Sequence, residues 1–194
     1  MNRTCLINYL IRKFDYSKYL EIGVNKGDNF TQIQCGYKIG VDPDPYSVAT
    51  HKIKSDEFFL INEDYFDLIF IDGLHHSEQV EKDVFNSLKF IKNGFIILHD
   101  CNPTTEEMQI VPRMQQGWTG DVWKFFAKFK YEWDYKCYVL DIDHGCGIIE
   151  IDGISRVKQR VDQRLLTYSD LENNRDLIGL KPFDKWHLQF PCHL

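Results

Sequence analysis

The stretch Tyr-Leu-Glu-Ile-Gly-Val-Asn-Lys-Gly at residues 19–27 decides the fold of this chain. A short apolar run carries an acid near its end and is followed by two glycines, which is typical of a strand that leads through a tight loop into a helix. A helix that starts there would offer free backbone N–H groups to a ligand. A second apolar run, residues 37–41, ends at Asp42, where a carboxylate can accept hydrogen bonds from a ribose diol. The stretch therefore predicts a nucleotide-binding unit of the α/β class.

The spacing of the two glycines separates three interpretations of this unit. The dinucleotide fingerprint Gly-x-Gly-x-x-Gly has three glycines, whereas this chain has Glu-x-Gly-x-x-x-Gly. An NAD(P)-dependent oxidoreductase is therefore the weaker enzyme hypothesis. A non-catalytic nucleotide-binding module is the alternative from another class, and the glycines alone do not exclude it.

Length and composition indicate one globular domain. The chain has 194 residues, of which 43% are apolar and 27% charged, with a net charge of −6. No cluster of lysines and arginines suggests nucleic-acid binding, and no apolar run is long enough for a membrane span. The six cysteines form no Cys-x-x-Cys pair and no signal peptide is recognised, so we expect a cytoplasmic protein. The sequence leaves open whether it forms a homo-oligomer.

Apolar periodicity predicts strands that alternate with helices. Strands are expected over residues 18–22, 37–41, 51–54, 66–71 and 95–98, and helices over residues 3–14, 28–34, 56–60 and 77–92 and around 122–129. Residues 137–142 and 147–151 predict a hairpin, and the tail should be partly helical around 168–180. This order predicts a Rossmann-like, doubly wound sheet, mostly parallel with an antiparallel C-terminal hairpin strand and with helices on both faces. Within the single domain 1–194 we expect a leading helix (1–16), a cofactor-binding core (17–151) and a C-terminal extension (152–194).

Polar residues recur at the carboxyl ends of the predicted strands, where ligands bind in such sheets. They are Glu21, Asp42, Asp72 and the pair His99-Asp100, with Asp56 and Glu57 after the short third strand. Acids have no packing reason to recur at these positions, so we expect them to form one site. Asp56 is equally explained as a helix cap.

Two histidines follow Asp72 in the run Asp-Gly-Leu-His-His. An imidazole near a carboxylate can act as a general base, and His75 is the candidate for that role, with Asp72 or Asp100 orienting its ring. The alternative is that the histidines only lead into the helix that begins near Ser77. His99 is the second candidate among the catalytic residues.

Two longer motifs resemble those of a known family. They are Ile-Asp-Gly-Leu-His-His-Ser-Glu-Gln-Val at residues 71–80 and Ile-Ile-Leu-His-Asp-Cys-Asn-Pro at residues 96–103. Together with the glycine motif and Gly-Val-Asp-Pro, they resemble class I S-adenosylmethionine (SAM)-dependent methyltransferases, and more narrowly the branch that methylates small molecules and sugars on oxygen. The resemblance covers about residues 17–150 and implies a seven-stranded sheet whose last strand is antiparallel.

The resemblance implies where SAM would bind. Glu21, Gly23, Asn25 and Gly27 would lie along its methionine and ribose parts, and Asp42 with Pro43 along the ribose. The adenine would lie near Asp56 and Glu57, and the reactive methyl group beside Asp72.

The resemblance also bears on whether the protein binds a divalent metal ion. Metal-dependent relatives hold the ion with the acid in the position of Asp72 and with an acidic or Asp-Asn pair after the next strand. Here that second element is His99-Asp100-Cys101-Asn102, which departs from both patterns, so metal use stays open. Oxygen ligands from Asp72, Asp100 and Asn102 would suit Mg²⁺, whereas His99 as a ligand would favour Mn²⁺ or another transition metal.

The long segment after residue 100 is the expected acceptor site. Its candidate contacts are His76, which precedes the segment, and Arg113, Trp118 and Lys124. Aromatic faces with a few charges suit a sugar or a nucleotide-sugar, and the cations suit a phosphate. Trp123 is better explained as a core residue. The expected function is O-methylation of a small hydroxylated metabolite, and the resemblance suggests a sugar of a surface polysaccharide.

Overall fold

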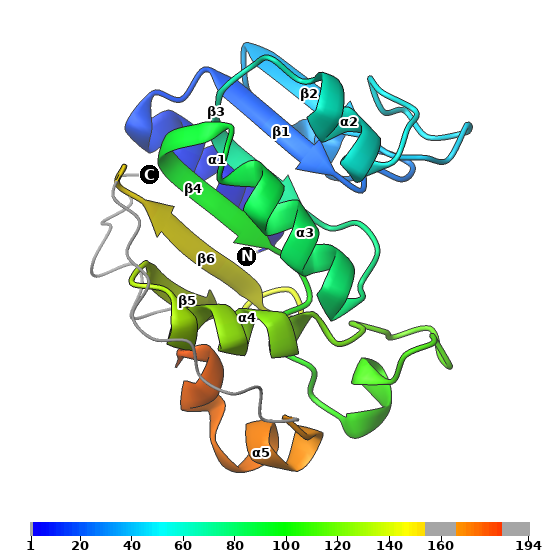
Figure 1. Ribbon diagram of the computed structural model, residues 1–194, viewed down its shortest axis with the longest axis vertical. Helices are drawn as coiled ribbons and strands as arrows, with labels where there is room; N and C mark the ends of the chain where they lie inside the picture. The colour runs from blue at the N-terminus through cyan, green and yellow to red at the C-terminus, as the bar shows by residue number, and fades with distance from the viewer. Residues whose placement is uncertain (1, 154–165, 184–194) are drawn as a thin grey trace.

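One mixed sheet organises the computed structural model, which describes residues 2–153 and 166–183. Its seven strands lie in the order β2-β1-β3-β4-β6-β5-β7 (Figure 1). Strand β6 is antiparallel to both of its neighbours, β4 and β5, and every other neighbouring pair is parallel. The strands are β1 (Lys18–Ile22), β2 (Tyr37–Val41), β3 (Phe66–Ile71), β4 (Ile91–Leu98), β5 (Lys136–Leu140), β6 (Cys146–Ile151) and β7 (Leu180–Lys181).

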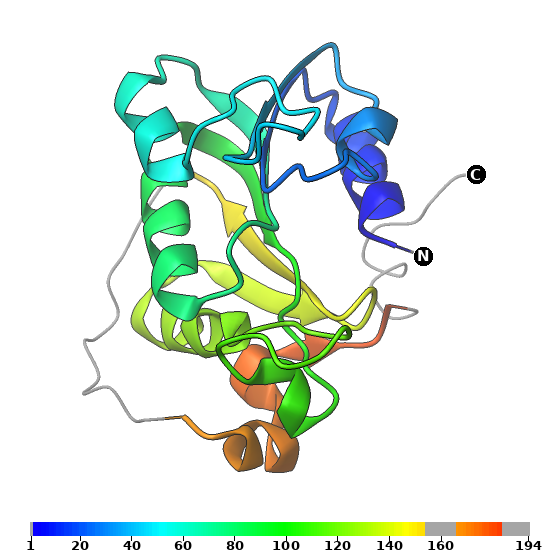
Figure 2. The ribbon, with the colours of Figure 1, turned by 90° about the vertical axis from the view of Figure 1, so that its right-hand side faces the viewer.

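Helices cover both faces of the sheet, as the sequence predicts. Helix α1 (Arg3–Phe14) lies on one face, and α3 (Ser77–Ser87) and α4 (Val122–Glu132) lie on the other (Figures 1 and 2). The remaining helices are α2 (Ser55–Ile61), α5 (Tyr168–Asn173) and three short 3-10 helices, η1 (Phe30–Gln32), η2 (Glu106–Gln109) and η3 (Arg175–Ile178). No helix in the described ranges is long and apolar enough to cross a membrane.

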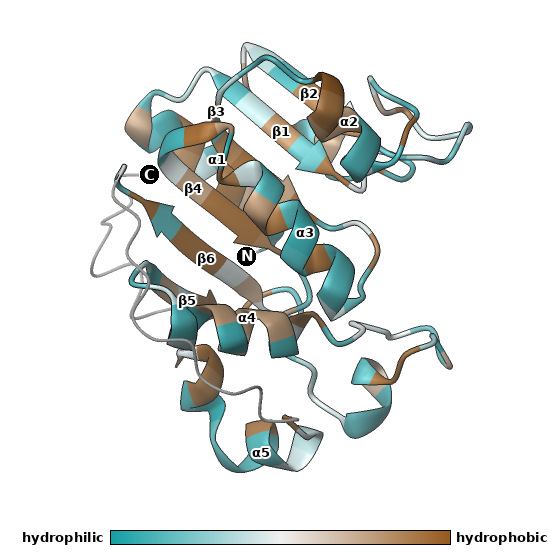
Figure 3. Cartoon of the chain, in the orientation of Figure 1, coloured by the Kyte–Doolittle hydropathy of each residue, from teal (hydrophilic) through white to brown (hydrophobic). Residues whose placement is uncertain are grey.

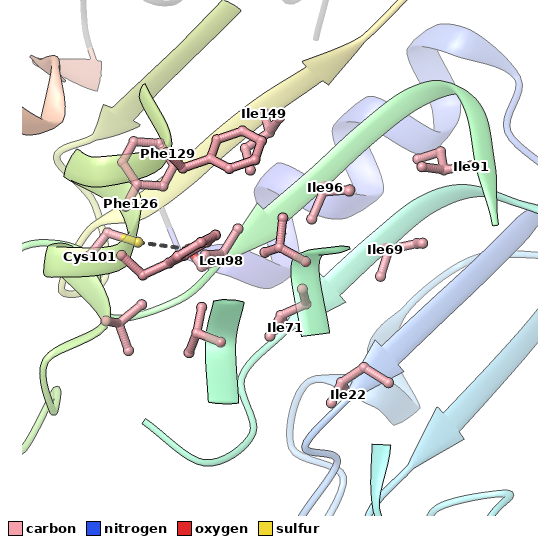
Figure 4. Close-up of a cluster of buried hydrophobic side chains, with 14 of the residues drawn as sticks. Ile22, Ile69, Ile71, Ile91, Ile96, Leu98, Cys101, Phe126, Phe129 and Ile149 are labelled. Atoms are coloured by element: carbon pink, nitrogen blue, oxygen red, sulfur yellow. Dashed lines mark hydrogen bonds between the residues drawn. The ribbon is translucent and has the colours of Figure 1, made fainter. Parts of the chain in front are cut away.

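Alternation along the strands divides the core into two layers. Tyr19 and Phe70 pack with α1, whereas Leu20 and Ile71 pack with α3 and α4. Successive side chains of a strand point to opposite faces, and burying both faces requires apolar residues at nearly every position, as β3 and residues 95–98 of β4 have (Figure 3). On the α4 side, the rings of Phe126 and Phe129 lie over the ends of the central strands (Figure 4).

The predicted strand at residues 51–54 is wrong. Only an isolated bridge forms there, between Val41 and His51, because the chain touches the edge of the sheet once and enters α2 at Ser55. The seventh strand is instead β7, which pairs with β5 at the opposite edge. The tail around residues 168–180 is helical over α5 and η3, as expected.

The predicted helix at residues 28–34 is also wrong, because only the short η1 forms. Asn29 turns its side chain inward, where it donates to Glu21 and accepts from Thr4. Lys38 Nζ donates to the carbonyl oxygens of Phe30 and Ile33, at 2.8 and 3.1 Å, so a side chain of β2 binds carbonyl groups at both ends of this short helix. Asparagine and β-branched residues are in any case poor helix formers.

The predicted helix at residues 77–92 ends early, at Ser87, and β4 begins at Ile91 rather than at residue 95. Leu88 and Ile91 fit the apolar periodicity of the helix, but Leu88 packs against the core from a turn and Ile91 from the start of β4. Gly94 permits this route, because its φ of 142° and its approach to the carbonyl oxygen of Asp67 leave no room for a Cβ. The proposed division of the chain at residue 151 stays a prediction.

Candidate active site

One pocket of about 790 Å³ opens at the carboxyl ends of β1, β2 and β3. Its wall includes seven of the nine predicted cofactor contacts, namely Glu21, Gly23, Asn25, Asp42, Pro43, Asp56 and Asp72. Gly27 and Glu57 do not line it. Of the predicted catalytic and substrate residues, His75, Arg113 and Trp118 line it as well.

The glycine loop bends because three of its positions, Gly23, Asn25 and Gly27, have left-handed backbone. Gly23 has φ +88°, and a Cβ there would lie 2.1 Å from the carbonyl oxygen of Asp72, so the loop packs directly on the end of β3. Gly27 has φ +87°, and a Cβ there would meet Val48. The two glycines therefore shape the loop against its neighbours, and the loop does not lead into an α-helix.

Asp42 fixes this loop in place. Its Oδ2 accepts from the backbone N–H of Asn25 at 2.7 Å, and its Oδ1 accepts from that of Asp44 at 2.8 Å. The side chain is 9% exposed and belongs to the pocket wall. Each carboxylate oxygen has a second lone pair, so both can still accept a hydrogen bond from a ligand. The ribose contact of Asp42 stays a prediction.

Glu21 lies on the floor of the pocket with 1% of its surface exposed. Its Oε2 accepts from the hydroxyl of Tyr19 at 2.5 Å and from the amide of Asn29 at 2.8 Å. Burial raises the pKa of Glu21 to about 7, and the two donors only partly oppose that rise. The carboxyl group therefore changes charge close to neutral pH.

Four predicted catalytic residues meet at the ends of β3 and β4. His75 Nε2 lies 3.2 Å from Asp72 Oδ1, and its Nδ1 lies 3.1 Å from Asp100 Oδ2. His99 Nδ1 lies 3.2 Å from an oxygen of each of the same two carboxylates. Asp100 adopts a left-handed backbone, with φ 60°, which turns its carboxylate toward the histidines. The structure thus brings these side chains together, and their catalytic roles stay predictions.

The charges of this cluster depend on one another. Burial opposes ionisation of Asp72, but His99 and His75 outweigh it and hold the pKa of Asp72 well below its usual value. Burial likewise opposes protonation of both histidines, and the facing carboxylates outweigh it and raise their pKa values. Without a bound ion, the cluster therefore favours imidazolium groups between carboxylates.

The same cluster fits a divalent cation. Single ligand atoms of Asp72, His99 and Asp100 all lie within 4.8 Å of one another. Nδ1 of His99 is buried and makes no aligned hydrogen bond, although two carboxylates face it. One nitrogen and two carboxylate oxygens suit Mn²⁺ or a similar ion better than Mg²⁺. Asn102 does not join this set, because its Oδ1 accepts from Arg175 at 2.8 Å and its amide donates to Asp141.

Two charged residues that the sequence interpretation missed complete the cluster. Arg3 Nη1 lies 3.0 Å from Asp143 Oδ2 and 3.1 Å from His99 Nε2, and Arg3 lines the pocket. His99, whose Nε2 lies 3.7 Å from Asp143 Oδ1, has the largest of the effects that lower the pKa of Asp143. Asp72 and His99 continue the strand alternation toward the α1 face, which explains why a residue of α1 reaches them. Nothing in the spacing of Arg3 or of the turn at 143–145 pointed to this site.

The far end of the pocket lies between α2 and α3. Asp56 lines it, whereas Glu57 is exposed and caps α2 by accepting from the N–H of Lys54. Gln79 and Asp83 of α3 also line this end, and sequence analysis missed both. Asp83 is 1% exposed and stands in the apolar row of α3, and an acid in that row was a usable signal. Burial raises the pKa of Asp83 to about 6.

The acceptor side of the pocket carries an aromatic wall. The Trp118 ring stacks on His75, with centroids 5.3 Å apart and planes at 19°, and the Arg113 guanidinium lies 6.0 Å from the Trp118 ring. Asp121 accepts from the backbone N–H of Ser77 at 2.7 Å, which ties the segment before α4 to the start of α3.

Two predicted substrate contacts lie outside the pocket wall. His76 precedes α3, and its carbonyl oxygen accepts from the N–H of Val80. Lys124 lies in the first turn of α4 and is only partly buried. Trp123 is fully buried in the core, as expected.

Comparisons with known proteins bear on the fold and on one segment of the chain. Residues 44–101 match the family model of a methyltransferase domain. No curated protein matches the sequence. The crystal structure of the O-methyltransferase TomG from Streptomyces achromogenes in complex with SAM has a TM-score of 0.56 at 11% identity, covering 78% of this chain and 80% of that one.

Two further solved structures share the fold. The S-adenosylhomocysteine (SAH)-bound methyltransferase from Podospora anserina has a TM-score of 0.57 at 16% identity and covers 77% of both chains. The O-methyltransferase from Bacillus cereus in complex with SAH has a TM-score of 0.52 at 14% identity and covers 80% of both. The match over residues 44–101 is to a methyltransferase domain, and the solved structures share the Rossmann-like fold of the seven-stranded sheet, so both agree with the class that the sequence motifs resemble.

Proposed function

We propose that this chain is a class I SAM-dependent methyltransferase that transfers the methyl group of SAM to a hydroxyl oxygen of a small metabolite. One observation carries the proposal: His75 lies between Asp72 and the ring of Trp118 in the pocket wall. We call this part of the pocket, at the ends of β3 and β4, the reaction end. The similar structures named as O-methyltransferases support oxygen as the acceptor atom.

The pocket has room and chemistry for the whole cofactor. Asp42 would accept from the ribose hydroxyls, Glu21 would face the methionine amino group, and the adenine would extend toward Asp56. Bound SAM supplies a methyl group on a positively charged sulfur, already activated for transfer. The chain's own residues then have to position the acceptor and take up its proton.

His75 is the proposed base. Its Nε2 is hydrogen-bonded to Asp72 Oδ1 at 3.2 Å and the Trp118 ring packs on its face, so the imidazole is oriented. Its Nδ1 lies 3.1 Å from Asp100 but makes no aligned hydrogen bond, so in a neutral His75 this is the nitrogen that would take the proton. The same carboxylates stabilise the imidazolium that forms when His75 takes the proton of the acceptor hydroxyl. A sugar hydroxyl is a weak nucleophile at neutral pH, so removal of this proton is the step that most needs the protein.

A divalent ion held by Asp72, His99 and Asp100 is part of the proposal. With neutral histidines, the carboxylates of Asp72, Asp100 and Asp143 and the guanidinium of Arg3 leave two net negative charges, which one divalent cation would neutralise. Such an ion would lower the pKa of a bound hydroxyl group. Binding it requires that Nδ1 of His99 give up its proton.

The proposed acceptor is a sugar or nucleotide-sugar, with a surface polysaccharide as the destination of the product. Trp118 would stack on the ring face, and Arg113 would meet a phosphate or another anionic group. The cytoplasmic location stays a prediction.

Calorimetry with SAH and with NAD, followed by a methyl-transfer assay on a panel of sugars and nucleotide-sugars, tests the proposal. We expect micromolar binding of SAH, none of NAD, and turnover of at least one hydroxylated acceptor. Binding of NAD alone would favour the oxidoreductase, and SAH binding without turnover of any polar acceptor would favour a non-catalytic module.

A further inference from the structure

One side chain of the C-terminal extension reaches the chain directly after Asp100, although the extension has no role in the proposed function. Arg175 Nη1 in η3 donates to Asn102 Oδ1 and to the carbonyl oxygen of Pro103, both at 2.8 Å. Its Nη2 lies 3.4 Å from the hydroxyl of Tyr168. All three of these acceptors are uncharged, so the guanidinium fixes the positions of groups here and does not neutralise a carboxylate.

The segment that Arg175 contacts is held from two sides. The N–H groups of Cys101 and Asn102 donate to carbonyl oxygens of the turn at 143–145, at 2.9 and 2.8 Å. The Asn102 amide donates to Asp141 at 3.1 Å while its oxygen accepts from Arg175, so both ends of the amide are bound. Backbone bonds therefore hold one side of the segment, and one arginine of the C-terminal extension holds the other.

Asp100 depends on this segment for its orientation. Its backbone is left-handed, with φ 60°, and a residue other than glycine keeps that conformation only where its neighbours enforce it. Its Oδ2 lies 3.1 Å from His75 Nδ1 and 3.2 Å from His99 Nδ1. Because the backbone sets the direction of the Cα–Cβ bond, a change of φ at Asp100 would turn the carboxylate away from both rings.

We propose that Arg175 is a positioning residue for methyl transfer, which acts through Asn102 and Pro103 to hold Asp100 in the conformation that aims its carboxylate at His75. The inference rests on the proposed function, in which Asp100 stabilises the imidazolium that forms on His75. A displacement of about 1 Å in such a group can lower a rate roughly 100-fold, so a contact outside the pocket wall can control the rate. The C-terminal extension thereby completes the reaction end, although it lies outside residues 17–150, where the sequence resembles methyltransferases.

The first test compares two substitutions of Arg175. Methionine has no donor, so Arg175→Met should lower kcat at least about 10-fold, while KM for SAM and the affinity for SAH stay within about 2-fold of wild type. A lysine ammonium group has three donors and can replace Nη1, so Arg175→Lys should keep kcat within about 5-fold of wild type.

The matched control is Lys130→Met. Lys130 Nζ donates to the carbonyl oxygen of Asp176 at 2.9 Å, so it contacts the same η3 without touching residues 101–103. If Arg175 acts through that segment, and not by holding η3 in place, Lys130→Met should keep the wild-type kcat.

A double-mutant cycle separates positioning from general stability. Asp100→Asn removes the charge of the carboxylate, and asparagine tolerates left-handed backbone. In protein that carries this substitution, Arg175→Met should lower kcat by no more than about 2-fold, because the group that Arg175 positions is already lost. A role in folding alone would lower kcat equally in both backgrounds.

Hydrogen exchange followed by NMR gives a readout that needs no acceptor. In Arg175→Met, the backbone amides of Cys101 and Asn102 should exchange at least about 10-fold faster than in wild type, because their segment has lost one of its two supports. The amides of β1 should exchange as in wild type, which shows that the variant is folded.

The outcomes separate the inference from the proposed function. Wild-type protein that binds SAH but turns over no acceptor contradicts the proposed function, and the inference with it. An Arg175→Met rate near wild type, equal losses in both backgrounds, or unchanged exchange at Cys101 and Asn102 overturns the inference and leaves the proposed function intact.

Discussion

The two ends of the pocket are built in different ways. The loop end comes from one continuous stretch, residues 21–44, and is fixed by hydrogen bonds from backbone N–H groups to Asp42. The reaction end joins side chains that are far apart in sequence, such as Arg3, His75, His99 and Asp143, through charged contacts. We therefore expect substitutions at the loop end to change affinity, and substitutions at the reaction end to change rate.

The largest expected effect is that of His75→Ala. Loss of the general base should lower kcat by roughly 100- to 10,000-fold while the SAH affinity stays within about 3-fold of wild type. The comparison variant is His76→Ala, because the sequence suggests both histidines but only His75 lines the pocket. Single-turnover methyl transfer measures both. A His75→Ala rate near wild type with intact cofactor binding would remove His75 from the mechanism.

Metal removal should have the next largest effect. Dialysis against EDTA should lower the rate about 100-fold, and Mn²⁺ should restore it better than Mg²⁺, because His99 supplies a nitrogen ligand. His99→Ala should bind Mn²⁺ at least about 10-fold more weakly in a direct titration. Full activity in EDTA together with no Mn²⁺ binding would exclude the ion.

Asp42→Asn changes the loop end of the pocket and should therefore lower the affinity for the cofactor. The variant keeps the shape of the side chain but loses the charge that attracts the N–H groups of Asn25 and Asp44, so SAH should bind about 10-fold more weakly. The rate at saturating SAM should stay within about 2-fold of wild type. A large fall in that rate without a fall in SAH affinity would contradict the expectation that the loop end determines affinity and the reaction end determines rate.

The smallest expected effect concerns stability. Burial raises the folded-state pKa of Glu21 to about 7, from 4.5 for an ordinary glutamate, so between these values the folded state binds more protons and stability falls as pH rises. The total is at most about 3.5 kcal/mol, at about 1.4 kcal/mol for each unit of pKa. Glu21→Gln should remove this slope, so the variant should be more stable than wild type at pH 8 in urea unfolding. Parallel stability curves for the two proteins from pH 5 to 8 would contradict the raised pKa.

The loop end was predictable from sequence because its determinants are local. Strand periodicity located β1 and β2, and the acid after β2 follows directly from that register. The helix expected at 28–34 failed because Asn29 and Lys38 make contacts across the fold that no local propensity contains. The strand expected at 51–54 failed because its few residues reach the sheet edge only once.

The reaction end was predictable only in part. Asp72, His75, His99 and Asp100 follow buried strands, and the ends of adjacent parallel strands meet, so their convergence follows from topology. Arg3 and Asp143 reach the cluster through the docking of α1 and of the turn between β5 and β6, which sequence spacing does not encode. Gln79 and Asp83 were not predicted, because the spacing of the apolar residues in α3 indicates a helix that packs on the core and does not show that an acid in the same row lines a pocket.

The contacts of Arg175 bear on the order in which parts of the chain fold during synthesis. Its guanidinium donates to Asn102 Oδ1 and to the carbonyl oxygen of Pro103, both at 2.8 Å, directly after the carboxylate that faces both histidines. During synthesis on the ribosome, the strands that carry the cofactor loop emerge long before this arginine does. A nascent chain should therefore form the glycine loop first, and should fix the segment that follows Asp100 only once η3 has docked.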